Sequence, residues 1–423
     1  MFSFNTIYKS NKSSFKNFSL YLFANVVQVV VALIMNPLWA SNLSHKDYAI
    51  MGYFDSFGLF ILPLIGFSFL SYYAKEYFNL DEIARKNVLS SILLFQLGFG
   101  FISMLILLGS FKLYFEYNNI SFPFYPYALL SFLRVFIFNI YSFYMLNLRL
   151  EKRALSFFKV NVLYVLFNTL LIFIFVVFLH KGALGNMLAI LISASGFSIY
   201  ALFKHVKKIK IDFVVIKDAV NFCWPLIFSA ILTYFFTGFD KLLLEKVDNV
   251  YVFGLYNVGF KFASYFTIFT LTVNSTFEPD FYQAIATKDK KKLIKIIVLI
   301  NSIIIIPIVF FLFSSNLVIG FLTNYRYTEA ASYARILVLS NITQSISFTL
   351  STIIIALGFS KVSLFEKLIG SIFTVFMYIY LIKHFGFIGA AWGNVLCYFI
   401  MSLISGLILL YLYRRRHSLY FNA

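Results

Sequence analysis

The chain has 423 residues, of which 61% are hydrophobic, 21% aromatic and only 12% charged. Soluble domains carry roughly a quarter charged residues, so this composition excludes an ordinary water-soluble protein. The formal net charge is +18. Most of the basic residues lie between apolar runs, where they act as a membrane topology signal, and we therefore expect no nucleic-acid partner.

Apolar runs long enough to cross a hydrocarbon core of roughly 30 Å recur from end to end. We therefore predict an all-α, polytopic membrane protein with about twelve transmembrane helices. The predicted spans are 18–38, 48–72, 88–111, 123–147, 157–179, 183–204, 214–239, 250–276, 293–313, 330–356, 362–382 and 387–412. The apolar part of residues 314–327 is too short to span, so we place it at the membrane interface.

The basic residues indicate how the chain is oriented. Most of them fall in the N-terminus, the even-numbered loops and the C-terminus, for example at residues 290–292 and 414–416. Positive residues are retained on the cytoplasmic side, so both termini are predicted to be cytoplasmic. The first apolar run is longer than the apolar region of a signal peptide, and we expect it to be retained.

An internal repeat relates two stretches that begin at Phe158 and Ser360. The matched pairs are Lys159 and Lys361, Gly182 and Gly386, Gly185 and Gly389, and Arg134 and Arg335. Because six helices is an even number, the two halves are predicted to enter the membrane in parallel. We expect a six-helix bundle at 1–204, a basic cytoplasmic linker at 205–220 and a second six-helix bundle at 221–423, with a substrate cavity between the bundles.

Four charged residues lie away from the ends of the predicted spans: Asp55, Arg134, Lys261 and Arg335. Each costs about 2.5–3.5 kcal/mol at a helix centre, so such residues usually face a cavity or a partner. Two explanations are open, a cationic water-filled cavity or structural pairing and snorkelling. The second suits Arg335 best, since about five residues at 1.5 Å each separate it from the outer interface.

Polar residues flank Lys261 at helical spacing, namely Asn257, Ser264 and Tyr265, and are predicted to line the cavity. Three cations against one carboxylate suit an anionic ligand, above all a phosphate or pyrophosphate. Asp55 is predicted either to pair with a cation or to exchange a proton or a sodium ion.

Several kinds of site are not expected. The sequence has no GxxxxGK[ST] phosphate loop, and its soluble segments are too short for an ATPase domain. Its five histidines fall in loops or tails, and Cys223 and Cys397 in predicted spans, so neither a metal site nor a disulfide framework is expected. We predict no enzyme activity and no cofactor.

The segment "NFCWPLIFSAILTYFFTGFDKLLLEKVDNVYVFGLYNVGFKFASYFTIFTLTVNSTFEPDFYQAIA" (221–286) resembles the Wzx-type O-antigen and polysaccharide flippases of the multidrug/oligosaccharidyl-lipid/polysaccharide exporter (MOP) superfamily. Residues 316–340 resemble the segment that leads into the tenth helix in this family. The matching residues are Trp224, Pro225, Asp240, Lys241, Gly254, Tyr256, Lys261 and Pro279.

This resemblance implies two six-helix bundles around a central cationic cavity that opens alternately to each side. It implies an oligosaccharide on undecaprenyl pyrophosphate as substrate, moved from the cytoplasmic to the periplasmic leaflet of a bacterial inner membrane, with membrane lipids and polysaccharide assembly proteins as further partners. Asp240 then acts either as a helix cap or as part of a gate and ion-coupling site. The alternatives are a cation-coupled multidrug antiporter, a membrane glycan polymerase or acyltransferase, and a channel or structural protein.

Overall fold

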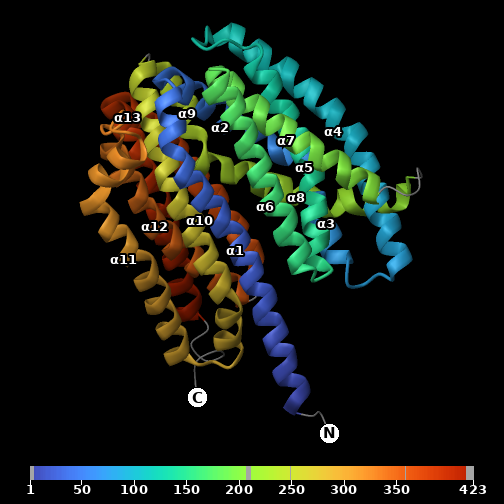
Figure 1. The fold of residues 1–423 in the computed structure, drawn as a ribbon. Helices are drawn as coiled ribbons and strands as arrows, with labels where there is room; N and C mark the ends of the chain where they lie inside the picture. Colours follow the sequence, from blue (N-terminus) through green and yellow to red (C-terminus); the bar gives the residue numbers. More distant parts are fainter. Residues whose placement is uncertain (1–3, 206–210, 248, 358, 416–423) are drawn as a thin grey trace. The chain divides into compact units, whose positions relative to one another are not determined.

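A computed structural model describes residues 4–205, 211–247, 249–357 and 359–415 of the chain (Figure 1). They form two compact units. Unit 1 takes Met1–Leu43 and Phe57–Ala230, and unit 2 takes Ser44–Ser56 and Ile231–Ala423. The described part of the chain is helical and contains no strand, which confirms the predicted all-α class.

The helices follow one another with short connections. In unit 1 they are α1 (Phe4–Asn42), α3 (Phe69–Glu76), α4 (Glu82–Asn118), α5 (Tyr127–Leu150), α6 (Ala154–Ile172), the π-helical η1 (Phe173–Phe178) and α7 (Gly182–His205). In unit 2 they are α9 (Phe239–Leu244), the 3-10 helix η2 (Glu245–Val247), α10 (Val250–Ala286), α11 (Lys290–Leu322), α12 (Ala330–Ala356) and α13 (Ser360–Arg415). Two further helices, α2 (His45–Gly66) and α8 (Phe213–Thr237), contribute residues to both units.

The predicted membrane spans lie largely on helical residues, and α13 contains two of them. The predicted span 48–72 is broken at Phe67 and Ser68, whose positive φ values separate α2 from α3. Within the described ranges, nine helices are long and apolar enough to cross a membrane. In this number α13 is counted once. The apolar stretch Val26–Asn42 of α1 is too short to be included, and α10 is not among the nine helices. Helix α11 includes the first part of residues 314–327, as far as Leu322, and their place at the membrane interface stays a prediction.

The repeated glycines occupy equivalent turns. Gly182 and Gly386 both have positive φ, 53° and 55°, a region that residues with a side chain rarely adopt. A Cβ on Gly185 would lie 2.8 Å from the Phe175 carbonyl oxygen, and a Cβ on Gly389 would overlap the Leu381 carbonyl. In each half the first glycine therefore turns the chain and the second lets the new helix start against the end of the preceding one.

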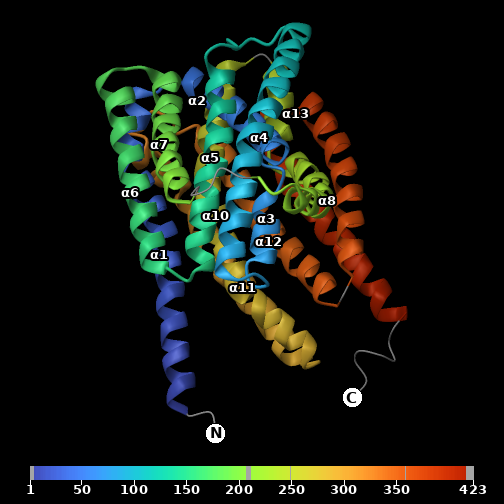
Figure 2. The same cartoon turned by 90° about the vertical axis from the view of Figure 1, so that its right-hand side faces the viewer.

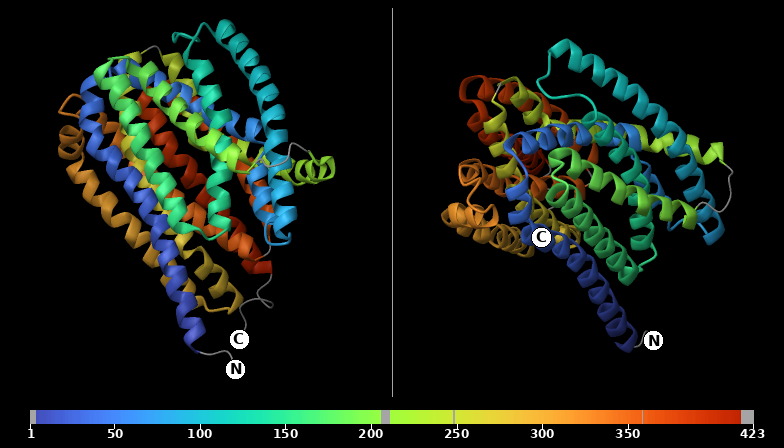
Figure 3. Two further views of the ribbon diagram at one scale, coloured as in Figure 1. Left: turned by 45° about the vertical axis from the view of Figure 1, so that its right-hand side comes forward. Right: turned by 45° about the horizontal axis from the view of Figure 1, so that its top comes forward.

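Unit 1 is held by aromatic packing between α3, α4, α5 and the first part of α8. Phe69, Tyr73, Ile92 and Phe143 lie in one buried cluster there. The Tyr73 hydroxyl donates a hydrogen bond of 2.6 Å to Asn147 Oδ1, so the polar end of this ring is satisfied inside the cluster. Helices α6 and α7 run side by side next to α5, and α1 packs along α6 (Figures 2 and 3).

Unit 2 is built around α10, α12 and α13, with α11 packed along α10 and α12. Its interior is more polar than a composition of 61% hydrophobic residues suggests. Buried side chains include Asn274 on α10, Asn341 and Ser345 on α12, and Glu366 on α13. The Ser345 hydroxyl, for example, lies 3.3 Å from Asn274 Oδ1 and donates to it across the α10–α12 contact.

The boundary between the two units differs from the expected linker at 205–220. Residues 206–210 of that linker lie outside the described residues. The first part of α8, up to Ala230, belongs to unit 1, although the sequence placed 221–230 in the second bundle. Residues 44–56 belong to unit 2, although the sequence placed them in the first. A two-bundle organisation with a cytoplasmic linker stays a prediction.

The turn at Gly386 gives a stability prediction. Its backbone has φ 55° and ψ −132°, so Gly386→Ala should cost about 1–3 kcal/mol of stability even though nothing surrounds the site. Thermal unfolding of the purified protein in detergent measures the effect. Gly406→Ala on the same helix is the control, because Gly406 also faces open space but has no positive φ, and it should be neutral or slightly stabilising. Equal melting temperatures for the two variants would contradict this reading.

Candidate functional site

Lys261 lies on α10, half-buried, and its Nζ is 5.7 Å from the centre of the Tyr48 ring on α2. An ammonium within about 6 Å of an aromatic face is attracted by the ring quadrupole. Tyr48 is itself buried and packs edge-on against Tyr327, with ring centres 5.2 Å apart. The Tyr48 ring on the first part of α2 therefore helps to stabilise the charge of Lys261 within this apolar helix.

This contact requires α2 and α10 to approach closely, and glycines make that possible. A Cβ on Gly254 of α10 would overlap the backbone carbonyl of His45. A Cβ on Gly52 of α2 would overlap the side-chain amide of Asn257. Because both positions lack a side chain, the start of α2 lies flat against α10 and brings Tyr48 to the level of Lys261.

The predicted polar stripe around Lys261 is only partly available to a ligand. Asn257 is buried against Gly52, and its Nδ2 donates to the Phe253 carbonyl at 3.0 Å. The Ser264 hydroxyl donates to the Lys261 carbonyl at 2.6 Å, a bond within the helix. Tyr265 is half-buried, and its hydroxyl has no hydrogen-bond partner among the described residues. Of the three, Tyr265 has the most free bonding capacity.

A second charged cluster lies at α9, where Asp240 and Lys241 are both buried. The Tyr256 hydroxyl donates a 2.5 Å hydrogen bond to Asp240 Oδ2. Lys241 Nζ lies 3.4 Å from the centre of the Phe260 ring, and the Asp55 carboxylate also acts on it electrostatically. Two buried opposite charges are thus compensated by each other, by a hydroxyl and by a ring.

The same cluster fixes the end of α8. The Ser56 hydroxyl on α2 donates to the Gly238 carbonyl at 2.6 Å, at the break between α8 and α9. Asp55, next to Ser56, is exposed rather than buried. The structure therefore places Asp55 and Asp240 in the same unit, one open at the protein surface and the other enclosed.

Arg134 lies on α5 in unit 1 and is half-buried. Gly58, on the part of α2 that belongs to unit 1, leaves room for it, since a Cβ there would lie 3.3 Å from the Arg134 Nη2 atom. Lys261 belongs to unit 2. The two midspan cations thus come from different units, as the sequence predicts, and a chamber shared by them stays a prediction.

Arg335 on α12 is tied to a neighbouring helix. Its Nη2 donates a 2.9 Å hydrogen bond to Asn316 Oδ1 on α11. This bond agrees with the structural explanation that the sequence favours for Arg335. A role for Arg335 in binding an anionic ligand stays a prediction.

Sequence reasoning did not single out Tyr48 or Lys241. Tyr48 is one of 29 tyrosines, so composition gave it no weight. Lys241 had a signal, since it follows Asp240 in the segment that resembles the flippases, but it lies just outside the predicted span 214–239 and was not counted among the charges within the spans. Only the fold shows that it is 4% exposed.

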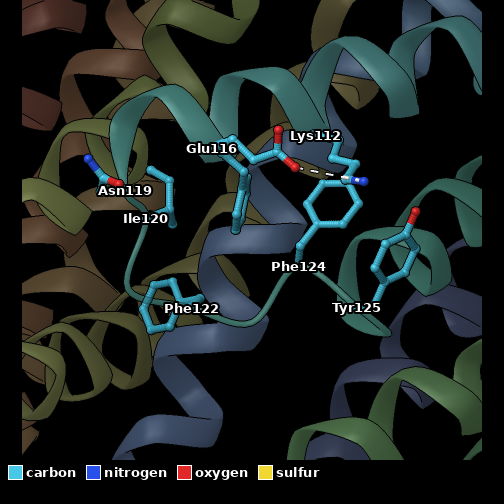
Figure 4. A pocket seen from close by; sticks show the side chains of 8 residues that line it. Lys112, Glu116, Asn119, Ile120, Phe122, Phe124 and Tyr125 are labelled. Carbon is cyan, nitrogen blue, oxygen red and sulfur yellow. Dashed lines mark ion pairs between the residues drawn. The ribbon is translucent and has the colours of Figure 1, made fainter.

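A pocket elsewhere in unit 1 contains none of the predicted site residues. It has a volume of about 240 Å³ and lies between the end of α4 and the segment that leads to α5 (Figure 4). Lys112 and Glu116 project from α4 and form an ion pair at 3.7 Å, with Phe124 and Tyr125 opposite them.

Across the described ranges, no group of three or more His, Cys, Asp or Glu side chains could hold a metal ion.

The buried tyrosine bond leads to a prediction. Tyr256→Phe leaves the Asp240 carboxylate without its hydroxyl donor in a dry environment, so it should cost about 1–3 kcal/mol of stability. Thermal unfolding in detergent measures this loss. Tyr282→Phe, an exposed position on the same helix, is the control and should stay within about 0.5 kcal/mol. A Tyr256→Phe protein as stable as the control would show that this bond does not hold the cluster.

Three solved structures share the fold over nearly the whole chain. The first is a multidrug resistance MATE family transporter of the MOP superfamily in an inward-facing conformation, with a TM-score of 0.73, 17% identity, and coverage of 92% of this chain and 96% of that one. The second is the lipid II flippase MurJ in an inward closed conformation, with a TM-score of 0.69, 16% identity, and coverage of 92% of this chain and 87% of that one.

The third is a MOP superfamily transporter from Pyrococcus furiosus, described as having a binding pocket of reverse polarity, with a TM-score of 0.65, 17% identity and coverage of 97% of each chain. At such low identities the likeness shows the fold alone, which this chain shares with these membrane proteins. No curated protein is significantly similar in sequence. A family model described as "Polysaccharide biosynthesis protein" matches residues 81–332, more than half of the chain. On this match, together with the membrane-spanning helical fold, the chain belongs to the polysaccharide biosynthesis protein family.

Proposed function

We propose that the protein is a flippase that moves an oligosaccharide linked to undecaprenyl pyrophosphate from the cytoplasmic to the periplasmic leaflet by alternating access. The observation that carries the proposal is a pair of half-buried cations within the spans, Arg134 in unit 1 and Lys261 in unit 2, in a member of a polysaccharide biosynthesis family. The protein then resides in a bacterial inner membrane with both termini in the cytoplasm.

The physical basis is the cost of moving a hydrated headgroup through lipid. Each polar group left unpaired in hydrocarbon costs several kcal/mol, so a glycan and a pyrophosphate need a hydrated path lined by protein. Arg and Lys both form charge-assisted hydrogen bonds with phosphate oxygens. Arg134 and Lys261 would both bind the pyrophosphate while the polyprenyl tail stays in lipid.

The remaining predicted residues take supporting roles in this proposal. Asp55, exposed and close enough to act on Lys241, would balance charge or exchange a proton or sodium ion. Asp240 would hold Lys241 and Tyr256 in place at the end of α8. The Tyr265 hydroxyl is enclosed without a hydrogen-bond partner among the described residues, and Arg335 is bonded to Asn316, so both would contribute less to the ligand.

Proteins of similar fold include both a lipid flippase and multidrug transporters, so the substrate class needs a direct test. An antiporter for organic cations should offer carboxylates and aromatics to its ligand. Here the midspan charges are mainly basic, and this favours an anionic lipid-linked glycan. Polysaccharide polymerases or assembly proteins would then act on the translocated product.

The mutational test uses the two cations. Arg134→Ala and Lys261→Ala should each lower surface polysaccharide at least about tenfold at matched expression, because each removes a charge-assisted hydrogen bond worth about 1.5–3 kcal/mol. Lys261→Arg should retain more export than Lys261→Ala, because it keeps a cation for the phosphate. Arg335→Ala is the matched control and should have a smaller effect.

Full export by Arg134→Ala, Lys261→Ala and the double variant would show that these two cations are not needed to bind the pyrophosphate. Purified protein in proteoliposomes separates the substrate classes. Translocation of a fluorescent lipid pyrophosphate supports the flippase. Transport of a fluorescent organic cation, with no response to lipid pyrophosphates, would establish the antiporter instead.

A further inference from the structure

A buried carboxyl group with no part in the proposed substrate site lies in unit 2. Glu366 on α13 is fully buried, with 0% of its surface exposed, inside the apolar stretch Leu364–Leu412. It follows the start of α13 at Ser360 by less than two turns and lies close to the start of the predicted span 362–382, so it is not among the four charges expected away from span ends. An ionisable side chain at such a place is expensive and calls for a functional explanation.

Hydroxyl groups from two other segments surround the carboxyl group. The Ser351 hydroxyl on α12 lies 3.0 Å from Glu366 Oε1 and 3.1 Å from Oε2. The Ser405 hydroxyl, on the part of α13 after Gly386, contacts Oε1. Glu366 therefore joins α12 and both parts of α13 through side-chain hydrogen bonds.

The position of Ser405 suits a carboxyl group that gains and loses a proton. Its hydroxyl lies within bonding distance of Glu366 Oε1 and, at 2.9 Å, of the Met401 carbonyl oxygen, but it has a single hydrogen to donate. When Glu366 is ionised, Ser405 donates to it. When Glu366 is protonated, Glu366 donates to Ser405, and Ser405 donates to Met401. Both protonation states are thus hydrogen-bonded without any change in the backbone.

In the part of the chain that the structure describes, the only charged group recorded as acting on this carboxyl is Lys367, the next residue of α13. Lys367 is half-buried. From α12 and from the second part of α13, Glu366 is faced by the hydroxyls of Ser351 and Ser405.

A sodium ion fits this place less well than a proton. Sodium sites in transporters use backbone carbonyls of unwound helices as well as side chains. Around Glu366, α12 is a continuous helix from Ala330 to Ala356, and α13 departs from helical geometry at Gly386, far along the chain. Among the described residues, the side-chain oxygen atoms that hydrogen-bond together here belong to Glu366, Ser351 and Ser405.

We propose that Glu366 is a proton-binding site of unit 2. The reaction is the addition of one proton from water to the carboxylate, which gives the neutral acid, and its reversal returns the proton to water. Protonation removes the buried charge while α12 and the two parts of α13 are packed together. Separation of these segments during transport would hydrate the carboxyl and release the proton. The inference does not depend on which substrate the protein carries.

Infrared difference spectroscopy of the purified full-length protein in detergent, titrated with acid, tests the proposal. The wild-type protein should show a protonated carboxylic acid band that is lost in Glu366→Gln, an isosteric change that keeps the serine contacts. Asp240→Asn is the matched control at another buried carboxyl and should retain the Glu366 band. Ser405→Ala should keep the band but shift its frequency, because the acid loses its hydrogen-bond acceptor.

Three results would overturn the proposal. One is a titrating band that persists in Glu366→Gln, and another is a wild-type protein with no such band. The third is a response that appears with sodium chloride but not with choline chloride at constant pH, which would assign the site to sodium. If Glu366→Gln does not fold, the frequency shift in Ser405→Ala decides, and an unshifted band contradicts the assignment.

Discussion

The structure depends on one constraint, that a charged side chain buried in a protein surrounded by lipid needs partners within the protein. Asp240 and Lys241 satisfy it through each other, through the Tyr256 hydroxyl and through the Phe260 ring. Glu366 satisfies it through hydroxyls from two further segments. In lipid these groups cannot be hydrated in place, so the bonds decide which helices lie together.

Glycine determines where this chain can bring charge close to aromatic rings. Because Gly52 and Gly254 have no side chains, α2 and α10 approach closely, and Tyr48 reaches the level of Lys261. A lysine near a ring face keeps part of its charge compensated while it stays available to a ligand. The same arrangement of small residues and midspan cations fits a protein that must hold an anionic headgroup and then release it.

The protein does not use all of its internal charges alike. Asp55 is exposed, Lys261 and Arg134 are half-buried, and Asp240 and Glu366 are enclosed. Groups that stay partly open are available for a substrate or ion, whereas enclosed ones respond only when helices move apart. This division separates the proposed headgroup site from the proposed proton site within a single fold.

The sequence by itself determined the class of protein, the approximate positions of its long apolar helices and the equivalence of Gly182 and Gly386. Those features depend on local properties, namely the length of apolar runs and the backbone freedom of glycine. Only the tertiary structure decided that residues 44–56 join unit 2, that Lys241 is buried and that Glu366 meets Ser351 and Ser405. Burial and side-chain partners arise from contacts between segments that are distant in the chain. The hydropathy of one segment does not specify which other segments it contacts.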